Sequence, residues 1–272
     1  MEFSVLASGS KANATLVRTE TTSLLIDCGL SLREVTLRLR SLGVEPESIS
    51  AILITHEHTD HVAGIERFQR NYQTPIYVNR GTAKAISETI SVEHFSYDSF
   101  QIGDLEIRAI PVSHDAREPV GFLIEYSGKS LGVFTDLGQS SPELLQCLST
   151  VDALILESNH DLNMLAQSRY PHYLQERIRG SEGHLSNCAA GLMLEQIASK
   201  ESRRLKYVVA AHISDVANEP ELALQGLREG WRRAGVDRSP EFIAASQKFA
   251  TSFFSVLEDF ELTSIENVMG AV

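Results

Sequence analysis

Short runs of apolar residues, separated by turn-forming residues, dominate the start of the chain. Residues 3–7, 15–18 and 23–27 are such runs, and Ser-Gly-Ser and Thr-Glu-Thr-Thr lie between them. Apolar runs of this length, bounded by Gly, Ser and Thr, are typical of antiparallel strands joined by turns. We therefore predict that the chain opens with a β-meander.

A helical pattern follows the meander. Apolar residues recur at spacings of three and four between Leu32 and Leu42, residues 31–34 have the form of a capping box, and Gly43 can end the helix. The next run, residues 51–54, is uniformly apolar. A strand without alternation is typical of one that is buried on both faces.

The rest of the chain alternates between strand and helix patterns. We predict further strands at 76–78, 105–112, 120–126, 130–134, 153–156 and 207–211, and helices at 62–71, 82–90, 142–148, 170–179, 187–199 and 220–234. Residues 127–129, Ser-Gly-Lys, favour a hairpin turn. Because each sheet must bury its apolar side, this order predicts an α/β fold, an αββα four-layer sandwich in which residues 1–272 form one domain.

The amino-acid composition fits a globular protein and gives no indication of a membrane protein. Hydrophobic residues make up 43% of the 272 residues and charged residues 22%, as in soluble globular proteins. No apolar stretch approaches the roughly 18 residues of a membrane span, and the N-terminus lacks a signal-peptide pattern. Three widely spaced cysteines fit a reducing compartment. We expect a cytoplasmic protein with no membrane partner.

The net charge of the chain is unfavourable for one class of ligand. At −12, it repels polyanions at long range and counts against nucleic-acid binding. A local basic face or bound cations would be needed to reverse that effect.

Asp, His and Glu residues follow the predicted apolar strands. Six such residues are Asp27, His56, His114, Asp136, Glu157 and His212. Strand ends are rigid, and metal sites need donors placed to within fractions of an ångström. Alternatively, polar residues merely terminate strands, but this does not explain why all six are Asp, His or Glu.

The motif His56-x-His58-x-Asp60-His61 places three imidazoles and a carboxylate within six residues. Placing so many polar groups side by side raises the free energy of the folded state unless a cation binds them. His56 and His58 can face one metal, and Asp60 and His61 a second. Nitrogen and oxygen donors without thiolate suit zinc or manganese, and iron is also compatible.

This motif resembles the pattern of the metallo-β-lactamase superfamily, and the similarity runs through nearly the whole chain. The resemblance implies that two divalent metal ions are bound. Its ligand sets would be His56, His58 and His114 for the first ion and Asp60, His61 and His212 for the second, with Asp136 bridging both. Asp27 would orient ligands without binding metal.

The interval between Asp136 and His212 resembles the nuclease branches of that superfamily, namely the tRNA 3′-processing endonucleases and ribonuclease J. The resemblance implies that His184 is a general acid and that Glu157 is its partner. Protonation of a leaving oxygen by an imidazolium is worth about 100- to 10,000-fold in rate. The alternative for His184 is a structural role at the helix N-terminus ahead of Ser186.

Finer motifs resemble the bacterial YycJ/WalJ family. They are the segments 8–13, 113–122, 157–161 and 183–187. Members of that family are described as exonucleases that degrade double-stranded DNA from the 5′ end. One departure lies after His212-Ile213-Ser214, where two Asn residues are expected and the chain has Ala217-Asn218.

The resemblance implies a mechanism in which a metal-bridging hydroxide attacks a phosphodiester, Asp60 helps to orient it, and His184 protonates the leaving oxygen. The interval from Asp136 to His212 is too short for the inserted domain of ribonuclease J, and no arm for gripping tRNA is apparent. We therefore expect a 5′→3′ DNA exonuclease with double-stranded DNA as its nucleic-acid partner.

Substrate contacts are predicted in two places. Ser8, Ser10 and Asn13 can donate hydrogen bonds to a phosphate, although Ser-Gly-Ser is also common turn chemistry. Arg177 and Arg179 are candidates for contacts with backbone phosphates.

His160 is close enough to Glu157 in sequence to reach the site. It can equally be a packing or capping residue.

Two other functions remain open at this point. A small-molecule hydrolase that acts on a thioester, a lactam or a cyclic phosphodiester would suit the acidic charge. A metal-stabilised binding module without turnover is a different class, and the complete ligand set argues against it.

Overall fold

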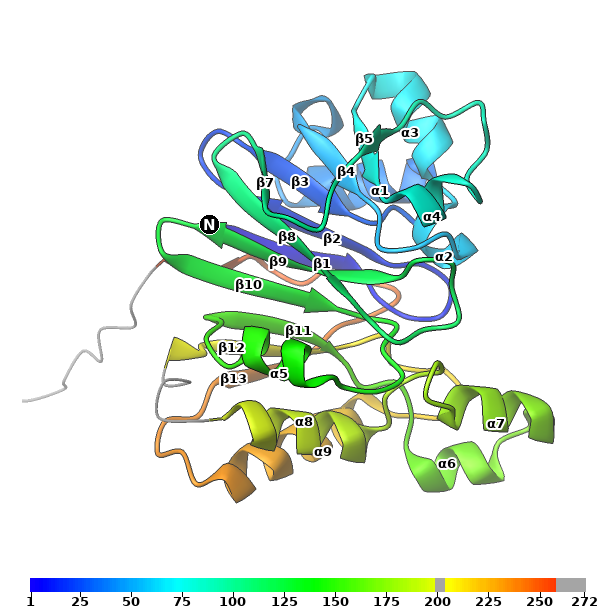
Figure 1. Ribbon diagram of the computed structural model, residues 1–272, viewed down its shortest axis with the longest axis vertical. Helices are drawn as coiled ribbons and strands as arrows, with labels where there is room; N and C mark the ends of the chain where they lie inside the picture. The colour runs from blue at the N-terminus through cyan, green and yellow to red at the C-terminus, as the bar shows by residue number, and fades with distance from the viewer. Residues whose placement is uncertain (199–203, 258–272) are drawn as a thin grey trace, which may run out of the picture.

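Two mixed β-sheets face each other in the computed structural model, which describes residues 1–198 and 204–257 (Figure 1). In the described residues, the first sheet has seven strands, in the order β14 (Phe254–Ser255), β1 (Glu2–Ala7), β2 (Ala14–Arg18), β3 (Ser23–Ile26), β4 (Ala51–Leu53), β5 (Ile76–Val78) and β6 (Glu93–His94). The strands from β14 to β3 pair antiparallel, and those from β3 to β6 pair parallel.

The second sheet is also mixed. Its order is β13 (Glu241–Ala244), β12 (Tyr207–Ala211), β11 (Ala153–Glu157), β10 (Lys129–Phe134), β9 (Val120–Tyr126), β8 (Leu105–Pro111) and β7 (Phe100–Ile102). The strands from β10 to β13 are parallel, whereas β7 to β10 form antiparallel pairs. The predicted hairpin between β9 and β10 is confirmed, with Ser127 and Gly128 at positive φ.

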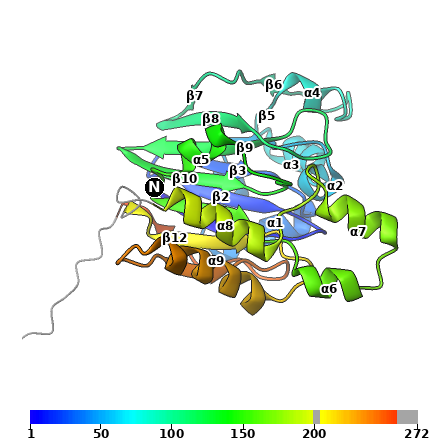
Figure 2. The ribbon, with the colours of Figure 1, turned by 60° about the horizontal axis from the view of Figure 1, so that its bottom comes forward.

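Helices cover the outer face of each sheet, so the predicted αββα sandwich is confirmed (Figures 1 and 2). The first sheet carries α1 (Leu32–Ser41), α2 (Thr59–Val62), α3 (Ile65–Tyr72) and α4 (Arg80–Ala83), with the 3₁₀ turn η1 (Pro46–Ser48). The second carries α5 (Pro142–Leu148), α8 (Asn187–Ile197) and α9 (Pro220–Ala234). In the part of the chain that the structure describes, no helix has both the length and the apolar character of a membrane span.

Apolar side chains fill the space between the sheets and the space under each helical layer. Phe3, Phe122 and Val209 belong to the cluster between the sheets. Separate clusters pack under the helices of the first sheet and under those of the second. All residues of β4 are buried, as the uniform apolar run predicts.

Two helix predictions are wrong in detail. The predicted helix 62–71 is two helices, α2 and α3, because the Gly64 amide donates to the Cys28 carbonyl at 2.8 Å and the Asp60 carbonyl accepts from the Asn13 amide at 2.7 Å, in place of the helical bond between them. The predicted helix 82–90 is only the single turn of α4. Its apolar positions Ile86 and Ile90 still pack against the outer core, but as irregular chain.

Other differences concern short elements and helix ends. The patterns gave no indication of β6, β7, β13, β14 or of α6 (Leu162–Gln167), which are too short to show a period. The helix predicted from residue 170 is α7 (His172–Arg179), and α8 ends at Ile197. Ser199, the predicted end of α8, lies outside the described residues.

Candidate metal centre

The carboxyl ends of several strands meet at one edge of the sandwich and carry the predicted ligands. Asp27 and His212 directly follow β3 and β12, and Asp136 lies two residues beyond β10. All three have left-handed backbones, with φ values of 60° at Asp27, 55° at Asp136 and 51° at His212. Because non-glycine residues seldom adopt this conformation, such strain is typical of functional positions.

Asp27 is buried beneath the His56–His61 motif. Its carboxylate accepts hydrogen bonds from the Thr55 amide at 2.9 Å and from Nδ1 of His61 at 2.8 Å. The Thr55 hydroxyl also donates to Asp27 and lies 3.0 Å from Nδ1 of His56. These contacts leave Nε2 of both histidines directed away from Asp27. Thr55, which the sequence did not single out, is therefore part of the ligand support.

Three imidazoles form a first cluster. His56, His58 and His114 offer ring nitrogens that lie within 4.8 Å of one another. Nδ1 of His114 donates to the Gly183 carbonyl at 3.1 Å, so its Nε2 faces Nδ1 of His58 at 3.2 Å. Burial lowers the pKa of both His56 and His114. Neutral imidazole is the form that binds metals.

A second group of ligand candidates surrounds Asp136. Nε2 of His61 lies 3.0 Å from Asp136 and 3.3 Å from Asp60, and Nε2 of His212 lies 3.7 Å from Asp60. Burial opposes the ionisation of Asp60, but the neighbouring imidazoles of His212 and His61 outweigh it and lower the pKa of Asp60.

The pKa values of the two histidines in this second group are raised, not lowered. Burial disfavours their charge, but Asp136 and its neighbouring carboxylates raise the pKa of His61 and bring the pKa of His212 to about 10. Protons on these two rings thus balance the carboxylates, which is the role that a divalent cation would take over.

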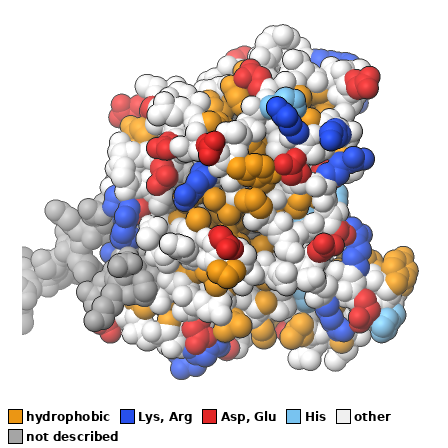
Figure 3. All heavy atoms as spheres, in the orientation of Figure 1, with side chains coloured by type: hydrophobic (Ala, Val, Ile, Leu, Met, Phe, Trp, Pro, Cys, Tyr) orange, Lys and Arg blue, Asp and Glu red, His pale blue; other side chains and the backbone are white. Residues whose placement is uncertain are grey.

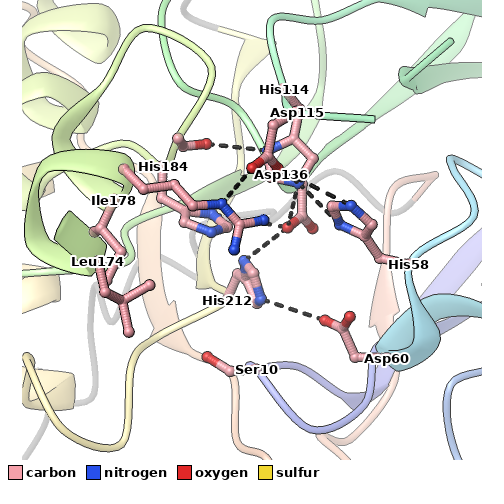
Figure 4. Close-up of a pocket in the computed structure, with 12 residues that line it drawn as sticks. Ser10, His58, Asp60, His114, Asp115, Asp136, Leu174, Ile178, His184 and His212 are labelled. Carbon is pink, nitrogen blue, oxygen red and sulfur yellow. Dashed lines mark hydrogen bonds and ion pairs between the residues drawn. The ribbon is translucent and has the colours of Figure 1, made fainter. Parts of the chain in front are cut away.

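Orphaned polar atoms show that these residues fit a metal. Nε2 of His56, Nε2 of His212 and Oδ2 of Asp136 are buried and make no well-aligned hydrogen bond to any described residue, although the last two lie within 4 Å of a group of opposite charge. Buried polar atoms nearly always have partners, so these three atoms among the candidate ligands fit the binding of a cation. In Figure 4, His58, Asp60, His114, Asp136 and His212 surround one space.

The candidate ligands come from both sheets. His56, His58, Asp60 and His61 follow β4 of the first sheet. His114, Asp136 and His212 follow β8, β10 and β12 of the second. The site therefore lies across the interface between the two halves of the sandwich.

Glu157 is fully buried at the end of β11 and joins two imidazoles. Its Oε1 accepts hydrogen bonds from Nδ1 of His184 at 2.8 Å and from Nδ1 of His212 at 2.7 Å. Its Oε2 accepts from the amides of Leu137 and Leu185. Burial opposes ionisation, but His184 and then His212 hold the pKa of Glu157 at about 2. The pairing of Glu157 with His184 that the resemblance implied is thus present as a direct hydrogen bond.

His184 lines the cavity and is held by the end of α7. Its amide donates to the Ile178 carbonyl at 2.9 Å. The N-terminus of α8 is capped by Ser186, whose hydroxyl accepts from the Ala189 amide. The helix-capping role is therefore filled by Ser186, and the His184 ring remains directed toward the cavity (Figure 4).

The cavity itself has a volume of about 150 Å³. Its lining residues are Ser10, His58, Asp60, His114, Asp115, Asp136, Leu174, Arg177, Ile178, Gly183, His184 and His212. Of the predicted substrate contacts, this set includes Ser10 and Arg177. Asp115, Leu174 and Ile178 were not predicted, although Asp115 directly follows a candidate ligand in the sequence.

Ser8 and Asn13 lie behind the cavity and have partners within the protein. The Ser8 hydroxyl accepts from the His212 amide at 2.7 Å and donates to Oδ1 of Asn13 at 3.3 Å. Nδ2 of Asn13 donates to Asp60 at 3.0 Å. This chain of contacts links the backbone of one candidate ligand to the carboxylate of another.

Arg179 and His160 also lie outside the lining of the cavity. Arg179 is 3.8 Å from Glu176 on its own helix. His160 is buried, its backbone pairs with Ser186, and its Nδ1 has no hydrogen-bond partner among the described residues.

Asn218 is buried, and it directly follows Ala217, where the sequence departs from the family pattern. Its Nδ2 donates to the Ser158 carbonyl at 2.9 Å, and it exchanges hydrogen bonds with Asn187. The loop that follows His212 is thereby attached to the end of β11 and to the start of α8.

Replacing His160 with glutamine is expected to reduce the loss of stability at acid pH. Burial lowers the pKa of His160 to about 4, below its value in an unfolded chain. Between the two values the unfolded state binds a proton that the folded state does not, so His160 destabilises the fold as pH falls through this window. The effect amounts to as much as about 3 kcal/mol.

Urea unfolding of both proteins in EDTA, between pH 7 and pH 4, measures this difference without a contribution from bound metal. The parent protein should lose more stability than the His160→Gln variant over that range. Equal slopes in the two proteins would contradict the prediction.

Comparison with known proteins gives consistent results. A family model described as a beta-lactamase superfamily domain matches residues 22–213. The chain is 34% identical over 230 residues to exodeoxyribonuclease YycJ of Bacillus anthracis, which covers 82% of this chain and 86% of the relative. It is 33% identical to exodeoxyribonuclease WalJ of Streptococcus pneumoniae, over 82% of this chain and 85% of the relative.

Solved structures agree with these matches at the level of the fold. The metallo-beta-lactamase fold protein YhfI of Bacillus subtilis superimposes with a TM-score of 0.70 at 16% identity. The superposition covers 92% of this chain and 98% of that one. The fold expected from the sequence motifs is therefore confirmed.

Proposed function

Because the chain is a metal-dependent hydrolase of the metallo-β-lactamase superfamily, in its YycJ-type branch, we propose that it is a dinuclear phosphodiesterase acting as a 5′→3′ DNA exonuclease. The observation that carries this proposal is the Glu157–His184 pair beside a set of unpartnered ligand atoms. Such a pair supplies a proton donor for an alkoxide leaving group, which phosphodiester cleavage requires.

In this proposal His56, His58 and His114 would hold one cation, Asp60, His61 and His212 would hold a second, and Asp136 would serve both. When bound, such a pair supplies a water of lowered pKa and stabilises the charge of an in-line displacement at phosphorus. The oxygen and nitrogen donors suit zinc or manganese, and iron is compatible.

The chain's own groups perform the remaining steps. Asp60, at the mouth of the second ligand group, orients the attacking water. His184 donates a proton from Nε2 to the leaving oxygen, since its Nδ1 is engaged by Glu157 at 2.8 Å. Glu157 is a positioning residue, because its carboxylate fixes the tautomer and direction of two rings at once.

The shape of the cavity supports attack at a chain end. Arg177 on α7 pairs with Asp115 across the cavity lining, and Leu174 and Ile178 lie beside it. A volume of about 150 Å³ is below the roughly 300–1,000 Å³ of typical ligand pockets. A duplex is too large for such a space, so the proposal places only the end of one strand at it.

The overall charge does not favour DNA, so the attraction must be local. The net charge is −12, and on the face in Figure 3 acidic and basic side chains are intermixed. Bound divalent cations are the largest charges in such a site and would reverse the field at its mouth. Ser10 and Arg177, both in the cavity lining, are the groups proposed to contact phosphate. Arg179 lies on the same helix but outside the cavity lining.

The small cavity is also compatible with a second candidate function, the hydrolysis of small molecules such as a cyclic phosphodiester, a thioester or a lactam. That activity needs the same cations but not an end of a polymer.

Incubation of the purified chain with end-labelled single- and double-stranded DNA and RNA, in manganese and in zinc, tests the proposal. Double-stranded DNA labelled at the 5′ end should release labelled mononucleotide at once, whereas a 3′ label should pass through progressively shorter products. EDTA should stop both reactions. The proposal fails if no nucleic acid is cleaved in a metal-dependent manner.

A further inference from the structure

We propose that Arg177 is the receptor for the 5′-terminal phosphate of the substrate, and that Asp115 occupies this receptor until DNA arrives. The inference rests on the proposed exonuclease function and adds the chemistry of the chain end that the enzyme selects. Among the described residues that line the cavity, Arg177 is the only lysine or arginine. An anion that enters the cavity therefore meets one side chain whose positive charge is permanent.

The position of Arg177 is defined by the helix that carries it. None of the side chains of α7 is buried, yet Leu174, Arg177 and Ile178 all line the cavity. The C-terminal turn of this helix packs on the loop before His184, where a Cβ at Gly183 would lie 2.2 Å from the Arg177 carbonyl oxygen. The helix is thus fixed against the proposed general acid, although its side chains remain accessible.

Asp115 connects Arg177 to the first ligand group. Nε of Arg177 donates to Oδ2 of Asp115 at 2.5 Å, and Oδ1 of Asp115 lies 3.5 Å from Nε2 of His114. The Asp115 carboxylate therefore lies between the guanidinium and His114, whose Nε2 faces the proposed metal. A phosphate bound by Arg177 would be the neighbour of the scissile phosphate, not the scissile phosphate itself.

A terminal phosphate is a better partner for Arg177 than Asp115 is. A carboxylate carries one negative charge, whereas a phosphomonoester carries about −1.5 to −2 at pH 7 and offers three acceptor oxygens. A guanidinium has five donors in a planar fork that matches phosphate oxygens. The Arg177 side chain is 59% exposed, so exchange of one anion for the other requires no opening of the core.

An internal phosphodiester would gain less from the same exchange. It carries a single negative charge, like the carboxylate that it would displace. The site therefore favours an end that bears a monoester, and in an exonuclease that starts at the 5′ end this group is the 5′-phosphate. Leu174 and Ile178 provide apolar surface beside it for the sugar or base of the terminal nucleotide.

Binding of DNA to a variant that cleaves it slowly, measured before cleavage is appreciable, tests this inference. In a His184→Ala background with manganese, fluorescence anisotropy compares duplexes that differ only in a 5′-phosphate or a 5′-hydroxyl. The phosphorylated duplex should bind about 10-fold more tightly, the range of one charge-assisted interaction. Arg177→Ala should abolish this preference.

Arg179 provides a matched control, because it lies on the same helix but outside the lining of the cavity. Arg179→Ala should retain the preference for the 5′-phosphate. Arg177→Gln, which keeps most of the side chain, should lose it like Arg177→Ala, and circular dichroism should show that both fold.

Equal binding of the two duplexes by the His184→Ala protein would overturn the inference, as would equal loss of preference in the Arg177 and Arg179 variants. Cleavage of both duplexes at equal rates by the parent chain would leave the exonuclease in place and remove only the phosphate receptor. Absence of any DNA cleavage by the parent chain would instead overturn the proposed function.

Discussion

Replacement of Asp136 by alanine is expected to lower turnover by at least about 1000-fold and to remove bound metal. Asp136 is the carboxylate that contacts both ligand groups, at 3.0 Å from Nε2 of His61 and 3.5 Å from Nε2 of His114. Without it, neither group keeps its full set of donors. Metal content per chain, measured by mass spectrometry, and turnover on DNA should fall together.

A second variant separates loss of metal from loss of folding. Asp136 has a φ of 55°, a conformation that asparagine adopts more readily than alanine, so Asp136→Asn should fold with less strain. It should also lose activity, since an amide is a weaker ligand. Asp98, an exposed aspartate, serves as the control, and Asp98→Ala should retain both metal and turnover. Full metal content and near-normal turnover in both Asp136 variants would refute the two-metal proposal.

Replacement of His184 by alanine is expected to reduce turnover by about 100- to 10,000-fold without loss of metal. His184 is hydrogen-bonded to Glu157 at 2.8 Å and lines the cavity, but the proposal gives it no metal to hold. The variant should therefore combine a low kcat with a metal content equal to that of the parent chain. Turnover on double-stranded DNA and metal analysis are the measurements.

His172 is the matched control for His184, because its side chain is 88% exposed on α7. His172→Ala should have normal turnover. The same pair of variants distinguishes the two candidate activities. A thioester hydrolase expels a thiolate, which needs little protonation, so turnover of a thioester that is unchanged in His184→Ala would favour the small-molecule hydrolase over the nuclease.

The layers of the fold could be predicted because their signals are local. The apolar run at 51–54 indicates a strand buried on both faces, and β4 is such a strand. The polar residues at strand ends indicated a common edge, and three of them, His114, Asp136 and His212, line the cavity there. Local patterns failed at 82–90, where apolar spacing suits a helix but Ile86 and Ile90 pack without forming one.

The supporting contacts could not be predicted, because they join residues that are distant in sequence. Arg177 and Asp115 are 62 positions apart, and Ser8 reaches the amide of His212 across 204 positions. From its neighbours in the sequence alone, Ser8 is predicted to be a turn residue. The left-handed backbone at Asp136 and His212 is likewise imposed by the surroundings and leaves no trace in composition.

The candidate ligands come from both sheets, so bound metal would affect how long the folded protein lasts in a cell. Each proposed cation would fasten one half of the sandwich to the other, so the halves could not separate without its release. Ligands that bind only the folded state stabilise it by an amount that grows with the logarithm of their free concentration. Metal scarcity would then act on this protein twice, by stopping catalysis and by shortening the lifetime of the folded chain before proteolysis.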